Sequence, residues 1–211
     1  MATPIVTHRA AILDPDKFGQ LLRDIDEFTG TPLVRIAMQL LPHIMTRPGE
    51  MRMGQWSEID WGQRIWNIPA ERTKLRRLHA VPLSDQVMLL LRELHCHTGG
   101  FEKMFPAQQS HLKYMSDNSI NQAMRRMGYG PDVVTAHGFR STASTFLNES
   151  GKWHPDAIER ALAHGDSNAI RGIYNRGNYW DERVQMAQWW SDYLDELKAG
   201  AKVLPFIAAG R

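Results

Sequence analysis

The sequence predicts a mainly α-helical domain with a small three-stranded antiparallel β-sheet, an α+β fold. Apolar residues recur at helical spacing through most of the 211 residues. Between residues 51 and 84 this pattern gives way to short runs rich in Trp, Ile and Val, separated by Gly and Pro, as in β-strands. We therefore expect a single domain over residues 1–198, which includes a leading segment at 1–13 and is followed by a tail at 199–211.

Two helices open this domain. Asp14 and Thr31 each precede a proline, and a capping residue followed by proline is typical of the first turn of a helix. Helical spacing then continues over residues 15–28 and 32–44. Pro42 removes a backbone donor, so it is expected to bend the end of the second helix.

Three short strands follow, around residues 56–61, 65–68 and 80–83. A run of four basic residues without an acidic one, 72–77, falls between the second and third strands. Turns lie at the surface, so this run is expected to be free to reach a ligand. Further helices are expected over residues 84–98, 116–127, 137–149, 155–164, 167–175 and 180–197, the last with Val184, Ala187, Trp190, Leu194 and Leu197 on its buried stripe.

The composition excludes several classes of protein. A content of 43% hydrophobic and 23% charged residues is that of a globular chain, which argues against a disordered or fibrous protein. The single cysteine cannot form an internal disulfide, and no uncharged apolar run is long enough to cross a bilayer. Residues 181–198 carry a local charge of −3, which leaves +5 for the rest of the chain and permits a polyanionic partner.

Individual candidate residues have ordinary structural explanations as well as functional ones. His137 and Arg140 share a helix face and could hold one anion, or they could be a capping histidine and a surface arginine. His164 could satisfy carbonyl groups at a helix end, Tyr174 could fill the core, and Arg47 could mark the end of a helix before Pro48.

A metal site is not expected. Histidines flank Cys96 on both sides, but no second Cys or His pair lies at the distance that zinc sites use. The segment also ends an apolar helix, which favours a structural role.

Taken in order, Arg47, Lys74, His137 with Arg140, His164 and Tyr174 resemble the catalytic residues of tyrosine recombinases, the phage integrase family. The surrounding sequence is similar to the integrases of P4-type prophages and genomic islands over about residues 7–197. The segments that carry the likeness most clearly are 47–50, 66–72, 79–84, 136–145 and 158–164.

The residue types also suit the breakage of a DNA phosphodiester without water. A tyrosine phenol, here Tyr174, can form an ester with phosphorus. The guanidinium groups of Arg47 and Arg140 can clamp the oxygens of the transition state with paired hydrogen bonds. A lysine on an exposed turn, Lys74, is placed to protonate the departing 5′ oxygen.

The resemblance implies the remaining roles. His137 would help to deprotonate the phenol, whose usual pKa is about 10. His164 would hydrogen-bond the phosphate, and Glu50 would orient Arg47. The turn residues that would contact DNA are Arg72, Arg76 and Arg77.

The function implied is site-specific DNA recombination, for prophage integration and excision, through a 3′-phosphotyrosine intermediate. The expected partners are double-stranded attachment sites and other integrase protomers in a tetrameric synapse, in the cytoplasm of a bacterial host, with no cofactor or metal. A catalytically silent DNA-binding or interaction fragment remains the alternative. The core-binding and arm-binding domains that precede the catalytic domain in this family are expected to be absent, and the tail is expected to pack on its own domain or on a neighbouring protomer.

Overall fold

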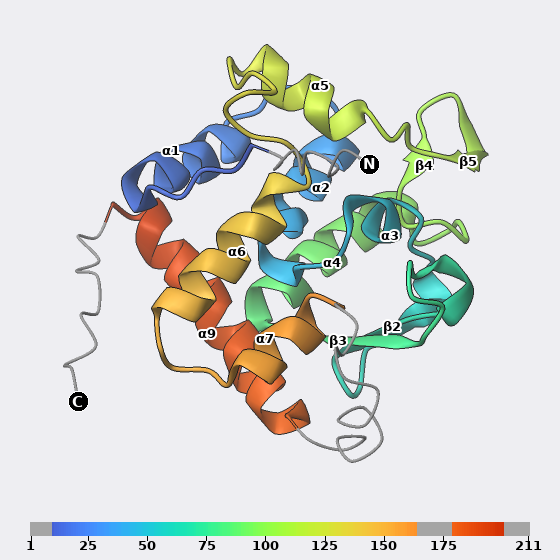
Figure 1. The fold of residues 1–211 in the computed structure, drawn as a ribbon. Helices are drawn as coiled ribbons and strands as arrows, with labels where there is room; N and C mark the ends of the chain where they lie inside the picture. Colours follow the sequence, from blue (N-terminus) through green and yellow to red (C-terminus); the bar gives the residue numbers. More distant parts are fainter. Residues whose placement is uncertain (1–9, 164–178, 201–211) are drawn as a thin grey trace, which may run out of the picture.

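The computed structural model describes residues 10–163 and 179–200. It shows a bundle of helices with a small sheet at one side (Figure 1). The helices are α1 (Pro15–Asp26), α2 (Pro32–Ile44), α3 (Pro48–Arg52), α4 (Asp85–Thr98), α5 (Ser119–Arg126), α6 (Gly138–Glu149), α7 (Pro155–Ala161) and α9 (Trp180–Lys198), with 3₁₀ turns η1 (Trp56–Glu58) and η2 (Ala70–Arg72). The strands are β1 (Ile59–Asp60), β2 (Ile65–Ile68), β3 (His79–Pro82), β4 (Pro106–Ala107) and β5 (Ser110–Tyr114).

The first two helices begin where the sequence predicts. The Asp14 side chain accepts a hydrogen bond from the Lys17 backbone N–H at 2.9 Å, and a proline occupies the first turn of both helices. This arrangement satisfies or removes donors that a helix start leaves without a partner. Ser84 caps α4 in the same way, through the backbone N–H of Val87.

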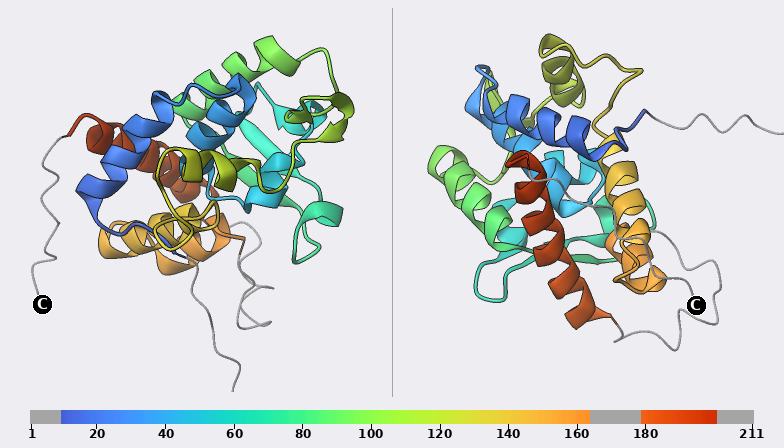
Figure 2. Two further views of the ribbon diagram at one scale, coloured as in Figure 1. Left: turned by 90° about the horizontal axis from the view of Figure 1, so that it is seen from above. Right: turned by 90° about the vertical axis from the view of Figure 1, so that its left-hand side faces the viewer.

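Helix α2 lies at the centre of the hydrophobic core. All its residues from Ile36 to Ile44 are buried except Gln39, and the helix contacts α1, α4, α5, α6 and α9. A helix that is apolar nearly all round is typical of a central position. Figure 2 shows α9 running along the side of the domain, with α1 packed against it. Gly19 permits this contact, because a Cβ there would lie 2.3 Å from the carbonyl oxygen of Leu197.

The predicted sheet is confirmed as an antiparallel β1–β2–β3 meander. Trp66 pairs with Val81 and Ile68 pairs with His79, and all four residues are buried. The basic run therefore lies in the connection between β2 and β3, residues 69–78, which we call the β2–β3 loop.

Four details differ from the sequence prediction. The short helix α3 and the β4–β5 hairpin were not expected, and α7 ends at Ala161 instead of residue 164. Val184 was predicted to lie on the buried stripe of α9, but it is 43% exposed, so that prediction is wrong. The reason is that Arg183 turns inward instead and donates a hydrogen bond to the Ala80 carbonyl at 2.6 Å.

Other expectations concern residues outside the ranges that the structure describes. The predicted leading segment mostly precedes residue 10, the predicted helix at 167–175 lies in the internal gap, and the tail lies almost entirely beyond residue 200. Among the helices at 10–163 and 179–200, none is long and apolar enough to cross a membrane.

Candidate active site

An open groove of about 860 Å³ brings together residues from four separate parts of the chain. It lies between the start of α3, the β2–β3 loop, the start of α5 and the segment before α6. Among its lining residues are Arg47, Glu50, Arg72, Thr73, Lys74, Asn118, Asn121, Thr135 and His137. Four of the seven residues predicted to form the catalytic site or support it thus share one cavity, which we call the active-site groove.

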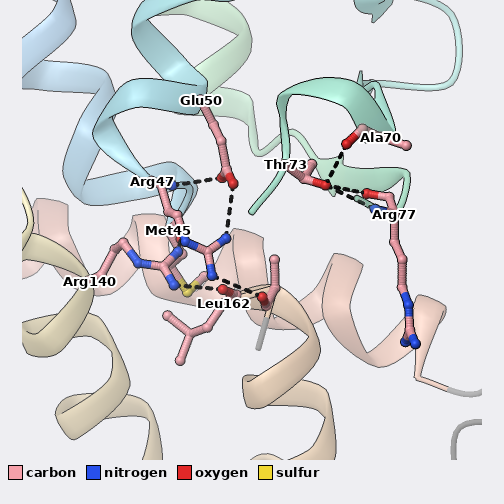
Figure 3. Close-up of polar contacts among 9 residues, drawn as sticks. Met45, Arg47, Glu50, Ala70, Thr73, Arg77, Arg140 and Leu162 are labelled. Carbon is pink, nitrogen blue, oxygen red and sulfur yellow. Dashed lines mark hydrogen bonds and ion pairs between the residues drawn. The ribbon is translucent and has the colours of Figure 1, made fainter. Parts of the chain in front are cut away.

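Arg47 is held at the mouth of this groove by Glu50. Its backbone is extended because Pro48 follows, and this places Arg47 at the N-cap of α3. One guanidinium nitrogen (Nη1) donates to Glu50 Oε1 at 2.9 Å, and the Arg47 backbone N–H donates to Glu50 Oε2 at 3.0 Å (Figure 3). Glu50 is buried, so the ion pair is shielded from water. These contacts fit the orienting role predicted for Glu50.

Arg140, on α6, lies beside Arg47 and deeper in the protein. It is only 3% exposed, and its guanidinium donates to the carbonyl of Met45 and, at 2.6 Å, to the carbonyl of Leu162 (Figure 3). Burial lowers the pKa of Arg140 to about 10, so the side chain is still a cation at neutral pH. Arg140 therefore joins the ends of α2 and α7.

Met45 forms a tight turn at the end of α2. It adopts a left-handed conformation with φ of 51°, which costs a non-glycine residue about 1 to 2 kcal/mol. The bond from Arg140 to the Met45 carbonyl helps to hold this turn, which lies two residues before Arg47. Arg140 thus contacts the short backbone segment that connects α2 to Arg47.

His137 lies at the start of α6 and lines the same groove. The backbone N–H of the preceding Ala136 donates to Asn121 Oδ1 at 2.9 Å, so Asn121 fixes the segment that leads to His137. Gly138 allows α6 to start close to the N-terminal segment, because a Cβ there would lie 2.2 Å from the Ala10 carbonyl oxygen. Sequence reasoning missed Asn121, since no local pattern marks an asparagine that contacts a loop 15 residues away.

The β2–β3 loop presents its basic residues differently. Lys74 is exposed and lines the groove, and Arg76 and Arg77 are also exposed. Arg72 is half-buried and forms an ion pair with Glu58 and a hydrogen bond with the Met53 carbonyl. The position of Arg72 thus favours a role in anchoring the loop, while contact of the three arginines with DNA stays a prediction.

His164 and Tyr174 lie outside the described residues. The last described residue before this gap is Ala163, whose carbonyl accepts a hydrogen bond from Arg47 at 3.2 Å. The residue immediately before His164 is therefore in contact with Arg47.

A buried histidine on β3, His79, lies near the same arginines. It is 6% exposed, and both of its ring nitrogens are buried. Burial lowers the pKa of His79 to about 3, and the cationic Arg183 and Arg140 act in the same direction. His79 is therefore neutral at physiological pH.

His43 on α2 is a second buried neutral histidine. Its Nδ1 lies 2.9 Å from the hydroxyl oxygen of Ser191 on α9. Burial lowers the pKa of His43 to about 4, although the negative charge of Asp195 opposes this shift.

These two histidines predict that the fold loses stability in mild acid. Below pH 6.5 the unfolded chain binds protons that the folded chain cannot accept until the pH approaches 4 for His43 and 3 for His79. At pH 5 each histidine should therefore cost about 2 kcal/mol of unfolding free energy relative to pH 7. Urea unfolding at the two pH values measures this loss.

His79→Phe should remove about 2 kcal/mol of that pH dependence, because the aromatic ring stays but the titrating group is lost. His97→Gln, at an exposed position of α4, is the matched control and should leave the dependence unchanged. An unaltered pH dependence in His79→Phe would contradict the assignment.

Comparison with known proteins places the chain in a family. Residues 11–180 match the phage integrase family. The chain is 39% identical over 197 residues to the integrase of Enterobacteria phage P4, a match that covers 87% of this chain and 45% of the phage protein. It spans about half the length of the curated relatives that it matches.

Solved structures show the same fold. The integrase from mycobacterium phage Brujita matches with a TM-score of 0.64 at 16% identity, over 93% of this chain and 65% of that protein. A lambda integrase tetramer bound to a Holliday junction matches with a TM-score of 0.58 at 20% identity, over 86% of this chain and 53% of the lambda chain. The fold is that of tyrosine recombinase catalytic domains. On the extent of the family match and the identity to the phage P4 protein, this chain belongs to the phage integrase family.

Proposed function

We propose that this chain is the catalytic part of a site-specific DNA recombinase, which cuts and rejoins DNA through a 3′-phosphotyrosine intermediate. The observation that carries the proposal is the meeting of Arg47, Lys74 and His137 in one groove, with Arg140 buried beside Arg47. Membership of the phage integrase family supports the same reaction. We infer that residues 1–198 form one catalytic domain.

The proposed reaction uses these groups in a defined order. The phenol oxygen of Tyr174 attacks phosphorus while its proton passes to His137. The bond between phosphorus and the 5′ oxygen breaks, and Lys74 gives that oxygen a proton. Reversal of these steps, with a 5′ hydroxyl from another strand, rejoins the DNA.

The arginines would stabilise the charge that develops on the phosphate. Arg47 has two fixed contacts, to Glu50 and Ala163, so its orientation is set before a substrate binds. Such preorganised donors lower the barrier because they need not reorient during the reaction. His164 is proposed to hydrogen-bond the same phosphate.

The proposed partners are double-stranded DNA and other integrase protomers. The exposed Lys74, Arg76 and Arg77 on the β2–β3 loop border the groove or lie next to it, where they can meet phosphate groups. The tetramer of lambda integrase on a Holliday junction supports an assembly of four protomers.

Trapping the covalent adduct tests the proposal. The chain is incubated with a pool of nicked duplexes of randomised sequence, in which the short cleaved strand diffuses away so that rejoining is blocked. DNA that stays linked to protein in detergent is recovered and sequenced, which gives a selected substrate for later assays. DNA binding without any adduct would instead indicate a silent DNA-binding fragment.

Lys74→Ala should slow cleavage of the selected substrate by about 100-fold or more, the usual contribution of a general acid. A substrate with sulfur in place of the bridging 5′ oxygen should restore the rate, because a thiolate leaves without a proton. Adduct formation on the two substrates, timed by gel electrophoresis, gives both rates.

Arg76→Ala is the control for loss of a neighbouring positive charge on the same loop. It should weaken DNA binding and leave the ratio of the two rates unchanged. A Lys74→Ala protein that stays slow on the sulfur substrate would leave Lys74 as a phosphate contact only.

A further inference from the structure

Thr73, the residue before Lys74, is a buried polar residue that the proposed reaction does not use. It is 7% exposed and lies between η2 and the exposed part of the β2–β3 loop. Its hydroxyl oxygen accepts a hydrogen bond from the Arg77 backbone N–H at 3.0 Å (Figure 3). The carbonyl oxygens of Arg77 and Ala70 lie 2.8 and 3.1 Å from the same hydroxyl, so either can accept its proton.

These contacts close the tip of the loop. Thr73 and Arg77 are four residues apart. The hydroxyl oxygen of Thr73 accepts a hydrogen bond from the Arg77 N–H and lies 2.8 Å from the Arg77 carbonyl oxygen. A backbone bond from the Arg76 N–H to the Thr73 carbonyl, at 3.1 Å, lies inside the same turn. Lys74 is thus held in a short closed segment, although the residues between its two ends are exposed.

The base of this segment is attached to the active site. Arg72 binds Glu58 and the carbonyl of Met53, and Met53 caps the helix that begins after Arg47. Thr73 follows directly on this anchored residue. The position of Lys74 relative to Arg47 therefore depends on two successive residues. Arg72 anchors the start of the loop, and Thr73 closes its turn.

The Lys74 side chain has no such support of its own. Within residues 10–163 and 179–200, its ammonium group makes no hydrogen bond or ion pair. The flexible four-carbon side chain of Lys74 therefore extends into the groove from a Cα whose position only the backbone of the loop fixes. A general acid works only within hydrogen-bond reach of the atom that it protonates, so the closure of the turn matters for its rate.

We propose that Thr73 is a positioning residue for Lys74: its hydroxyl closes the β2–β3 loop and keeps the ammonium group within reach of the leaving 5′ oxygen. This inference rests on the proposed function. It assigns Thr73 no contact with the substrate, and it predicts that loss of the hydroxyl impairs one step, protonation of the leaving group.

Thr73→Val tests the proposal, because valine keeps the shape of threonine and removes the hydroxyl. On the selected oxygen substrate it should slow adduct formation by about tenfold, a partial loss of general-acid catalysis. On the sulfur substrate it should match the unaltered chain. Thr73→Ser, which keeps the hydroxyl, should stay within about threefold of the unaltered chain on both substrates.

Thr98→Val is the matched control, because Thr98 is a buried threonine on α4 whose hydroxyl also binds backbone carbonyls, those of Leu94 and Met104. It should lower thermal stability without changing the ratio of the oxygen and sulfur rates. The double variant of Thr73→Val with Lys74→Ala should be no slower than Lys74→Ala alone, since the two residues act on one step.

The outcomes separate this inference from the function on which it rests. Equal slowing of Thr73→Val on both substrates would show a merely structural role, and an unchanged rate on oxygen would show no role at all; either result overturns the proposal. Absence of any adduct with the unaltered chain would overturn the proposed function itself. A sulfur substrate that fails to rescue Lys74→Ala would remove the general acid through which Thr73 is proposed to act.

Discussion

Tyr174→Phe is expected to abolish the covalent protein–DNA adduct, while Tyr179→Phe should leave it intact. Phenylalanine has no oxygen to bond to phosphorus, so the loss should be complete. Tyr179 is the rival nucleophile in the sequence, five residues later. In the structure its ring stacks on His154, with ring centroids 4.7 Å apart, and it lies at the N-cap of α9 with a left-handed φ of 78°. These contacts tie Tyr179 to the start of α7 and favour Tyr174.

The measurement is adduct formation on the selected nicked substrate, with DNA binding measured in parallel. Both variants should bind DNA as the unaltered chain does, because neither loses a positive charge. An adduct that persists in Tyr174→Phe and disappears in Tyr179→Phe would reverse the assignment of the nucleophile.

Much of the fold could be predicted because its signals are local. Asp14 and Ser84 cap helices through backbone N–H groups three residues away, which a short window of sequence reveals. The sheet was predictable for a similar reason. Its short apolar strands are separated by turn residues, and the structure pairs these consecutive strands as antiparallel neighbours.

The parts that could not be predicted depend on contacts between distant residues. The β4–β5 hairpin carries exposed polar residues and has no clear alternation of apolar residues. The inward turn of Arg183 depends on the carbonyl of Ala80, 103 residues earlier in the chain. No periodicity within α9 could distinguish that arrangement from the buried Val184 that the spacing predicted.

The candidate site also has a part that could be predicted from the sequence and a part that could not. The order of Arg47, Lys74, His137 and Arg140 is readable in the sequence through its resemblance to a family, and the structure brings the first three into one groove. The supporting contacts are not readable. The carbonyl that Arg140 binds at Met45 is 95 residues away, and the hydroxyl of Thr73 acts within a loop whose closure no sequence pattern shows.

Arg140→Ala is expected to reduce cleavage by about 2 to 4 kcal/mol of transition-state stabilisation, roughly 30- to 1,000-fold, because one charge-clamping donor is lost. It should also lower the unfolding free energy. The carbonyls of Met45 and Leu162 lose their donor inside the protein, and each unsatisfied buried acceptor costs about 1 to 3 kcal/mol. Urea unfolding and single-turnover cleavage measure the two effects separately.

Arg47→Ala should cause a cleavage defect equal to that of Arg140→Ala. It should also lower the unfolding free energy, because the buried carboxylate of Glu50 loses its cationic partner. Arg125→Ala, at an exposed position on α5, is the control and should change neither cleavage nor stability by more than about 0.5 kcal/mol. Equal cleavage defects at Arg125 and Arg140 would count against the site, because a general loss of positive charge would then explain both.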